Sequence, residues 1–188
     1  MAQAHDPQPD DAREVAALLA DAASGRPEAW RRLVERYSRR VFALAKSRCR
    51  SSEVAEEVTQ SVFATVATKL GRGGYSEQGR FEAWLFRVAM NRIRDEVRRV
   101  ARRGPMGGSE AALNAEAKAQ AMPAELAGLR SAMERLSEAD REIIEMRHHA
   151  GMGFREMAAL LNEPLGTLLA RHHRALRKLR DLMKGEEP

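Results

Sequence analysis

Three long segments in the N-terminal half of the chain carry apolar residues at helical spacing. Each stripe would line one face of a helix, so we expect the three helices to share a core. A shorter helix from Val15 to Ala23 is expected before them, after a disordered start at residues 1–11. The stripes are Trp30, Leu33, Val34, Tyr37, Val41, Leu44 and Ala45; Val54, Val58, Val62, Val66 and Leu70; and Phe81, Trp84, Leu85, Val88, Ala89, Ile93, Val97 and Val100.

The last fifty residues predict two helices separated by a tight turn. One apolar face runs from Phe154 through Met157 and Ala158 to Leu161, and residues 162–166 interrupt it. The next helix has an expected inner face of Leu168, Ala175, Leu176, Leu179 and Met183. Its opposite face carries Thr167, Arg171, Arg174 and Lys178. A short helix, a turn and a basic helix form a helix-turn-helix, which suits the major groove of DNA.

Turn-forming residues divide the chain into four parts. We expect a tail with a lead-in helix at 1–26, a helical bundle at 27–103, a linker at 104–123 and a helix-turn-helix domain at 124–184. The first bundle is interrupted by a polar loop, GRGGYSEQGR, at 71–80, and the Gly- and Ala-rich linker has room for a nascent helix at 110–120. The predicted fold class is therefore all-α, with two small helical bundles joined by a flexible linker.

Composition supports helices and an anionic partner. Only 5% of the 188 residues are aromatic, whereas Ala, Leu, Arg and Glu are abundant. The net charge of +5 and the pI near 9.9 favour nucleic acid without proving it. A single cysteine, Cys49, excludes an internal disulfide, and the polar start has no apolar run for a signal peptide or membrane insertion. We expect a cytoplasmic protein.

The motifs of common enzymes and metal sites are not found in the sequence. The loop at 71–80 lacks the G-K-[ST] ending of a phosphate-binding loop, and no Ser, His and Asp set lies in a catalytic motif. His148 with His149 and His172 with His173 form adjacent pairs whose members would point to different helix faces, and no spacing completes a zinc site. We expect no catalytic residue, no metal and no cofactor.

Four segments in order resemble a bacterial sigma factor of the extracytoplasmic-function (ECF) type. They are RPEAWRRLVERYSRRVFALA, EEVTQSVFATVATKL, RFEAWLFRVAMNRIRDEVRR and the C-terminal stretch from Leu136 to Arg180. A basic helix-turn-helix alone is common, but this order is specific. The resemblance covers nearly the whole chain and implies a factor that binds core RNA polymerase, directs it to promoters and takes part in DNA melting and transcription initiation.

The resemblance places polymerase binding on the second long helix of the first bundle. The matching positions are Glu57, Gln60 and Phe63, which stand three residues apart and would share neighbouring turns. An aromatic side chain beside two polar ones would form a small docking patch with an apolar anchor. Two simpler alternatives stay open, because Phe63 could belong to the core and Glu57 could be an ordinary surface charge.

The resemblance also places recognition of the single-stranded downstream promoter element at residues 71–102. The loop at 71–80 would capture an unstacked base, Asn91 would face the element, and Arg94, Arg98 and Arg99 would hold phosphates. An amide presents a donor and an acceptor together, which suits a base edge. Tyr75 could stack on a base or be partly packed, and Trp84 is assigned mainly to the core.

The helix expected to read the duplex upstream element departs from the family pattern. Where the family shows GTVKSRL, this chain has GTLLARH, so Leu169 and Ala170 replace a Lys and a Ser. Neither residue can donate a hydrogen bond. Either Thr167, Arg171, Arg174 and Lys178 read an unusual element while Leu169 touches a thymine methyl, or Leu169 belongs to a protein contact that recruits polymerase by another route. The cations that this helix face keeps favour the first explanation.

Two other functions remain possible on the sequence alone. A helix-turn-helix regulator that never joins polymerase would explain the basic C-terminal helix but not Glu57, Gln60, Phe63 and Asn91. A polymerase-recruiting adaptor with weakened upstream recognition would bind polymerase without initiating transcription. The sequence does not say whether an anti-sigma protein or another recruiting protein is a partner.

Overall fold

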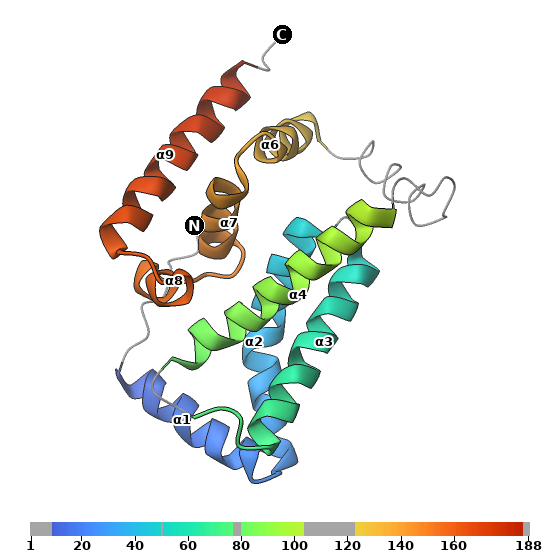
Figure 1. Ribbon diagram of the computed structural model, residues 1–188, viewed down its shortest axis with the longest axis vertical. Coiled ribbons are helices and arrows are strands. Elements are labelled where there is room, and N and C mark those ends of the chain that lie inside the picture. The colour runs from blue at the N-terminus through green and yellow to red at the C-terminus, as the bar shows by residue number, and fades with distance from the viewer. Residues whose placement is uncertain (1–8, 50, 77–79, 104–122, 186–188) are drawn as a thin grey trace.

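The computed structural model describes residues 9–49, 51–76, 80–103 and 123–185 (Figure 1). These residues form eight α-helices and no strand, so the all-α prediction is confirmed for the described chain. Four helices make an N-terminal bundle and four make a C-terminal bundle, and the two bundles lie against each other. The nascent helix expected at 110–120 lies outside the described residues.

The N-terminal bundle contains α1 (Pro9–Ala23), α2 (Pro27–Arg48), α3 (Ser52–Gly71) and α4 (Phe81–Arg103). Pro27 occupies the first turn of α2, where its missing N–H costs nothing. Ser51 caps α3 by accepting a hydrogen bond from the Val54 N–H at 3.4 Å. Helix α1 begins before the expected Val15 and packs on α2 and α3, because Val15, Leu18 and Leu19 are buried there.

The N-terminal bundle has an aromatic and aliphatic core that follows the predicted stripes through most of their length. Tyr37, Leu44 and Ile93 are fully buried, and the ring of Tyr37 meets that of Phe81 edge-on with centroids 5.4 Å apart. The end of α4 differs from the prediction, because Val97 and Val100 are exposed. Helix α4 extends past the helices that cover its apolar side, as Figure 1 shows for its C-terminal end.

The C-terminal bundle contains α6 (Ala124–Glu134), α7 (Glu138–His148), α8 (Phe154–Leu161) and α9 (Leu165–Lys184). Ser137 caps α7 by accepting from the Asp140 N–H at 3.2 Å, as its sequence position predicts. The Gly153 N–H donates to the Glu156 carboxylate at 2.6 Å and fixes the start of α8. Asn162 ends α8 in the left-handed conformation with φ 55°, so the predicted turn of the helix-turn-helix is confirmed.

The inner face of α9 is narrower than the sequence suggested. Leu168, Ala175 and Leu179 are buried, but Leu176 and Met183 are each 38% exposed. The last two residues lie at the edge of the apolar face, where α6, α7 and α8 no longer cover them. Their assignment to the core is corrected accordingly.

Candidate nucleic-acid and polymerase interfaces

The predicted polymerase-binding positions on α3 do not all reach the surface. Glu57 and Gln60 are exposed, whereas Phe63 is only 7% exposed and meets the Trp30 ring edge-on with centroids 6.3 Å apart. This burial corrects the expectation of an exposed apolar anchor, because an aromatic ring in the core cannot insert into a partner. Phe63 instead fixes the position of the exposed Glu57 and Gln60 against α2.

The polar face of α4 presents only part of its predicted DNA-binding set to solvent. Asn91 and Arg98 are exposed and lie two turns apart on one face. The Arg94 guanidinium pairs with the Glu142 carboxylate of α7. Arg99 makes two hydrogen bonds to Glu96, one turn earlier, at 2.7 and 2.6 Å. Asn91 and Arg98 are thus available in this conformation, while Arg94 and Arg99 hold protein carboxylates.

Tyr75 in the loop before α4 is packed on other aromatic rings. Its ring lies 4.5 Å from that of Trp84 and 5.8 Å from that of Phe81, measured between centroids. The half-buried position agrees with the simpler alternative of a partly packed tyrosine. Stacking on a base would require the ring to use the side that Trp84 leaves uncovered.

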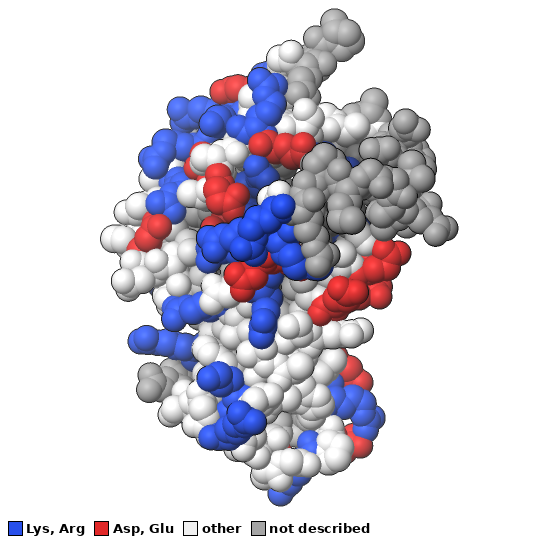
Figure 2. Space-filling model, turned by 45° about the vertical axis from the view of Figure 1, so that its right-hand side comes forward, with Lys and Arg blue, Asp and Glu red and all other residues white. Residues whose placement is uncertain are grey.

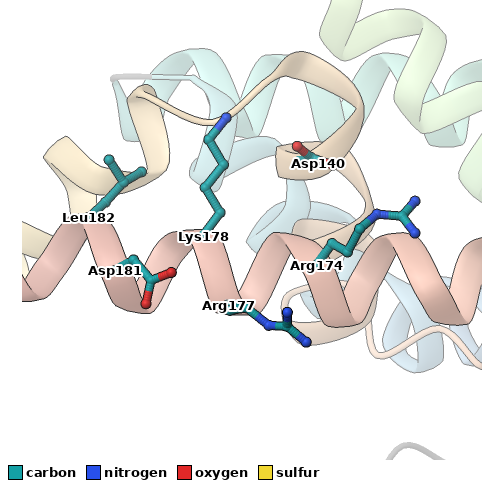
Figure 3. A pocket seen from close by; sticks show the side chains of 6 residues that line it. All are labelled: Asp140, Arg174, Arg177, Lys178, Asp181 and Leu182. Carbon is teal, nitrogen blue, oxygen red and sulfur yellow. The ribbon is translucent and has the colours of Figure 1, made fainter.

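Helix α9 carries most of its predicted DNA-facing residues on the surface. Thr167, Arg174 and Lys178 are exposed, and Leu169 is 44% exposed. Arg174 and Lys178 line a hollow together with Asp140 of α7 and with Arg177, Asp181 and Leu182 of α9 (Figure 3). The exposed cations can follow a phosphate backbone without any change in the bundle.

Arg171 has a structural partner that the sequence pattern did not predict. Its guanidinium makes two contacts with the Glu163 carboxylate, at 2.9 and 2.8 Å. Glu163 lies in the turn between α8 and α9, so this ion pair with its single hydrogen bond fastens the turn to the first part of α9. Arg171 therefore stabilises the helix-turn-helix, and its availability to DNA is lower than that of Arg174.

Arg177 is exposed beside the predicted row of cations but was not among the residues that the sequence pattern predicted. Its signal was its position three residues after Arg174 and one before Lys178. Figure 2 shows that blue side chains are most frequent in the upper half of the face drawn, at the height where α9 and α6 lie in Figure 1. A wider cationic surface than a single row is the better description of α9.

Two histidines from separate sequence pairs meet in the C-terminal bundle. The Nε2 atoms of His148 and His172 lie 3.4 Å apart, and Phe154 meets the His172 ring edge-on. Burial lowers the pKa of both imidazoles, as does the charge of Arg147. Within the described ranges, no cluster of three or more His, Cys, Asp or Glu side chains is placed to hold a metal ion.

Cys49 is buried at the end of α2, and burial raises the pKa of its thiol to about 11. A thiol with this pKa is not a reactive group at neutral pH.

Among the helices that the structure describes, none is both long and apolar enough to cross a membrane.

Comparison with known proteins agrees with the arrangement of two bundles. Residues 33–103 match the family model for sigma-70 region 2, and residues 132–181 match that for sigma-70 region 4. The RNA polymerase sigma factor CnrH of Cupriavidus metallidurans is 30% identical over 190 residues, which cover 95% of this chain and 97% of CnrH. The ECF sigma factor RpoE of Cereibacter sphaeroides is 35% identical over 132 residues, covering 69% of this chain and 72% of RpoE.

This chain belongs to the ECF sigma factors. Its partners are core RNA polymerase and promoter DNA, and it directs promoter recognition and transcription initiation. The sigma factor CarQ of Myxococcus xanthus is a further relative, 29% identical over 85% of this chain and 91% of CarQ.

Solved structures of sigma factors have the same fold. CnrH in complex with the cytosolic domain of CnrY superposes with a TM-score of 0.69 at 27% identity, over 91% of this chain and 97% of CnrH. RpoE of Bartonella quintana in complex with the anti-sigma factor NepR has a TM-score of 0.59 at 21% identity, over 84% of this chain and 98% of RpoE, which shows a shared fold. The predicted function as a sigma factor is thus confirmed by the family, while the roles of single residues stay predictions.

Proposed function

We propose that the two bundles divide the work of this sigma factor between them. The N-terminal bundle, whose functional part is residues 27–103, binds core polymerase and the single-stranded downstream element. The C-terminal bundle, residues 124–184, binds the duplex upstream element. The observation that supports this division most directly is that Asn91 on α4 and Arg174 on α9 are both exposed, each on a rigid basic helix of a different bundle.

We assign polymerase docking to the exposed face of α3. Glu57 and Gln60 are neighbours one turn apart, and the ring of Phe63 holds this part of α3 against Trp30 of α2. A carboxylate and an amide on a rigid helix can pair with cationic and hydrogen-bonding groups of polymerase. Phe63 acts in this proposal as a positioning residue and not as a contact.

We assign base recognition in the downstream element to Asn91, with Arg98 on neighbouring phosphate. Ile93 and Met90 on the opposite side of α4 are buried, so the helix cannot rotate the amide away from solvent. Arg94 and Arg99 would join Arg98 only after exchanging Glu142 and Glu96 for phosphate. Tyr75 would contribute through the exposed part of its ring.

We assign contact with the upstream element to Thr167, Arg174 and Lys178, with Arg171 supporting the turn. The 44% exposure of Leu169 places its side chain where a thymine methyl could meet it. The alternative role of Leu169 in a protein contact uses the same exposure. Binding of the full-length chain to duplex promoter DNA at increasing salt tests the first role, because no salt-dependent affinity at all would exclude contact of this helix with DNA.

We further propose that this sigma factor acts in the cytoplasm without catalysis of its own and that an anti-sigma protein restrains it. Support for the last point comes from relatives: CnrH was solved with the cytosolic domain of CnrY, and the Bartonella RpoE with NepR. A pull-down from cells grown without stress, with the tagged full-length chain, would test for such a partner.

A pair of substitutions tests the division of work. Gln60→Ala should weaken co-elution with core polymerase on size-exclusion chromatography, whereas Asn91→Ala should leave co-elution unchanged. Run-off transcription with saturating Asn91→Ala variant should fall by roughly tenfold or more, since a bidentate amide–base contact contributes about 1–3 kcal/mol. If Asn91→Ala weakens polymerase binding and transcription equally, the assigned role of Asn91 is wrong.

A further inference from the structure

Helix α7 carries an acidic stripe on the side that faces the N-terminal bundle. Glu138, Glu142 and Glu145 stand at i, i+4 and i+7, so their side chains share one face. Glu142 and Glu145 are the buried charged residues of the described chain. Burying a carboxylate is costly unless a partner compensates it. The partners of these carboxylates therefore decide why the stripe exists.

The partners of the acidic stripe come from the other bundle. Arg48, at the end of α2, pairs with both Glu138 and Glu145, and its Nη1 lies 3.1 Å from the Glu145 carboxylate. The side chains of Arg48 and Glu145 are only 4% and 2% exposed. Arg94 of α4 pairs with Glu142. Two arginines of the N-terminal bundle thus pair with three carboxylates of the C-terminal one.

Two more arginines of the N-terminal bundle bind backbone carbonyls of the C-terminal one. Arg40 Nε donates to the Ala150 carbonyl at 2.6 Å, after the end of α7. Arg87 Nη2 donates to the carbonyls of Ala159 and Leu160, at 3.1 Å each. Helix α8 has no basic residue in its own last turn, so Arg87 supplies the cation that the negative end of the helix favours.

In these contacts between the bundles, arginine side chains donate to carboxylate or carbonyl oxygens. All four cations belong to the N-terminal bundle and all acceptors to the C-terminal bundle. Polar contacts of this kind can exchange with water, and apolar residues of both bundles also belong to one buried cluster. Interfaces between two parts of one chain commonly allow relative motion unless they are large and apolar. The nineteen residues from 104 to 122 can span at most about 65 Å when extended, so the chain connection leaves the bundles room to separate.

We propose that Arg40, Arg48, Arg87 and Arg94 form an interdomain latch that holds the free sigma factor closed, and that the latch must open before both bundles can engage polymerase and promoter. The inference rests on the proposed function of α4 in DNA binding. Arg94 cannot pair with Glu142 and with a phosphate at once, and Arg87 lies on the same outward face of α4, with its guanidinium held by α8. The closed conformation therefore competes with the promoter for the same helix.

The latch acts as a restraint more than as a source of stability. A buried ion pair gains little over an apolar contact, because desolvation of both charges offsets their attraction. Its energetic consequence is selective, since removing one partner leaves the other charge buried and unpaired in the closed conformation alone. If only the open conformation binds polymerase, the apparent affinity is lowered in proportion to the fraction of molecules that are open. The restraint needs no second protein.

Glu142→Gln tests the latch on the side that has no proposed role in DNA or polymerase binding. The amide keeps the shape of the side chain and removes the charge that holds Arg94. Glu134→Gln is the matched control, because Glu134 makes the same charge change on α6, where it pairs with Arg130 of its own helix. Small-angle X-ray scattering of the full chain should show a larger radius of gyration for Glu142→Gln than for Glu134→Gln.

The second measurement is affinity for core RNA polymerase, titrated with the same full-length variants. Glu142→Gln should bind about fivefold more tightly than Glu134→Gln, as expected when a partly exposed ion pair is removed from the closed conformation. Glu138→Gln, which removes a charge that holds Arg48, should act in the same direction, with thermal unfolding to verify that it folds. An unchanged radius for both variants overturns the latch, and so does an expanded radius with unchanged affinity. If the radius grows but neither the variants nor the control binds polymerase, the proposed function is wrong, while the interdomain contacts still hold the chain closed.

Discussion

Helices α4 and α9 have the same sequence character but differ in what their cations do. Both are long, basic and amphipathic, with 23 and 20 residues. On α4, Arg87, Arg94 and Arg99 hold protein carbonyls or carboxylates. On α9, Arg174, Arg177 and Lys178 are exposed, and Arg171 is held by Glu163. A basic helix in the sequence therefore predicts the possible ligand, whereas the neighbouring elements decide whether the cations are available to it.

The difference follows from where each helix lies. Helix α4 contacts α2 and α3 of its own bundle and α8 of the other, so acceptors reach it from two directions. The extensive contacts of helix α9 are with α6, α7 and α8 of its own bundle. One side of α9 faces away from these helices, as Figure 1 shows. We expect α9 to bind duplex DNA in the closed conformation and α4 to bind its strand only after opening.

The largest effect is expected from removing the core beneath α4. Phe86 is fully buried, and Phe86→Ala should lower the free energy of unfolding by about 3–5 kcal/mol because it leaves a cavity that the bundle cannot fill. Leu168→Ala is the corresponding change under α9, with an expected loss of about 2–5 kcal/mol. Urea unfolding of both variants measures the losses. Equal stability of Phe86→Ala and the parent protein would mean that α4 is not held as described.

The closed conformation should weaken as pH rises through neutrality. Burial raises the pKa of Glu145 to about 7 despite Arg48 and Arg141, and burial together with Glu82 across the interface raises that of Glu156 to about 7 despite Arg40. If opening returns each pKa toward its usual value, closing takes up protons and is favoured at lower pH. The closed-to-open ratio should then fall about tenfold for one such group between pH 6 and 8.

Scattering profiles of the full chain recorded across this pH range measure that change. Glu156→Gln provides the control for one group, since an amide cannot titrate, and it should flatten the dependence. A radius of gyration that is constant from pH 6 to 8 would contradict the proposed link between these carboxyl groups and closure.

Two arginines of α9 separate a DNA contact from a structural contact. Arg174→Ala should lower affinity for duplex DNA severalfold and reduce the slope of log affinity against log salt by about 0.9, because one phosphate contact is lost. Arg171→Ala removes the same charge but also the ion pair with Glu163, so it should mainly lower the unfolding temperature of the chain. Fluorescence anisotropy and thermal unfolding measure the two effects. A reversed pattern would exchange the two assigned roles.

The smallest effect is expected at Leu169, where the family pattern has a lysine. Leu169→Lys should raise affinity for duplex DNA by a few-fold at low salt and steepen the salt dependence by about one phosphate contact. The exposed position allows the change without disturbing the bundle. Should Leu169→Lys abolish binding to core polymerase while DNA affinity stays the same, Leu169 belongs to a protein contact instead.

The sequence by itself determined the helices, the two-bundle architecture and the sigma-factor family. Apolar spacing marks helices through local geometry alone, and Ser137 as the cap of α7 or Asn162 as the end of α8 depend only on neighbouring residues. The order of the family motifs carried the function, because it spans both bundles.

Tertiary structure alone decided which of the predicted residues are available. The burial of Phe63, the exposure of Val97 and the bond between Arg171 and Glu163 depend on which helices pack together. The acidic stripe of α7 was visible at helical spacing, but its partner Arg48 lies 97 residues from Glu145 in the chain. A charge pattern shows that a partner is needed, and only the packing of the two bundles shows which group supplies it.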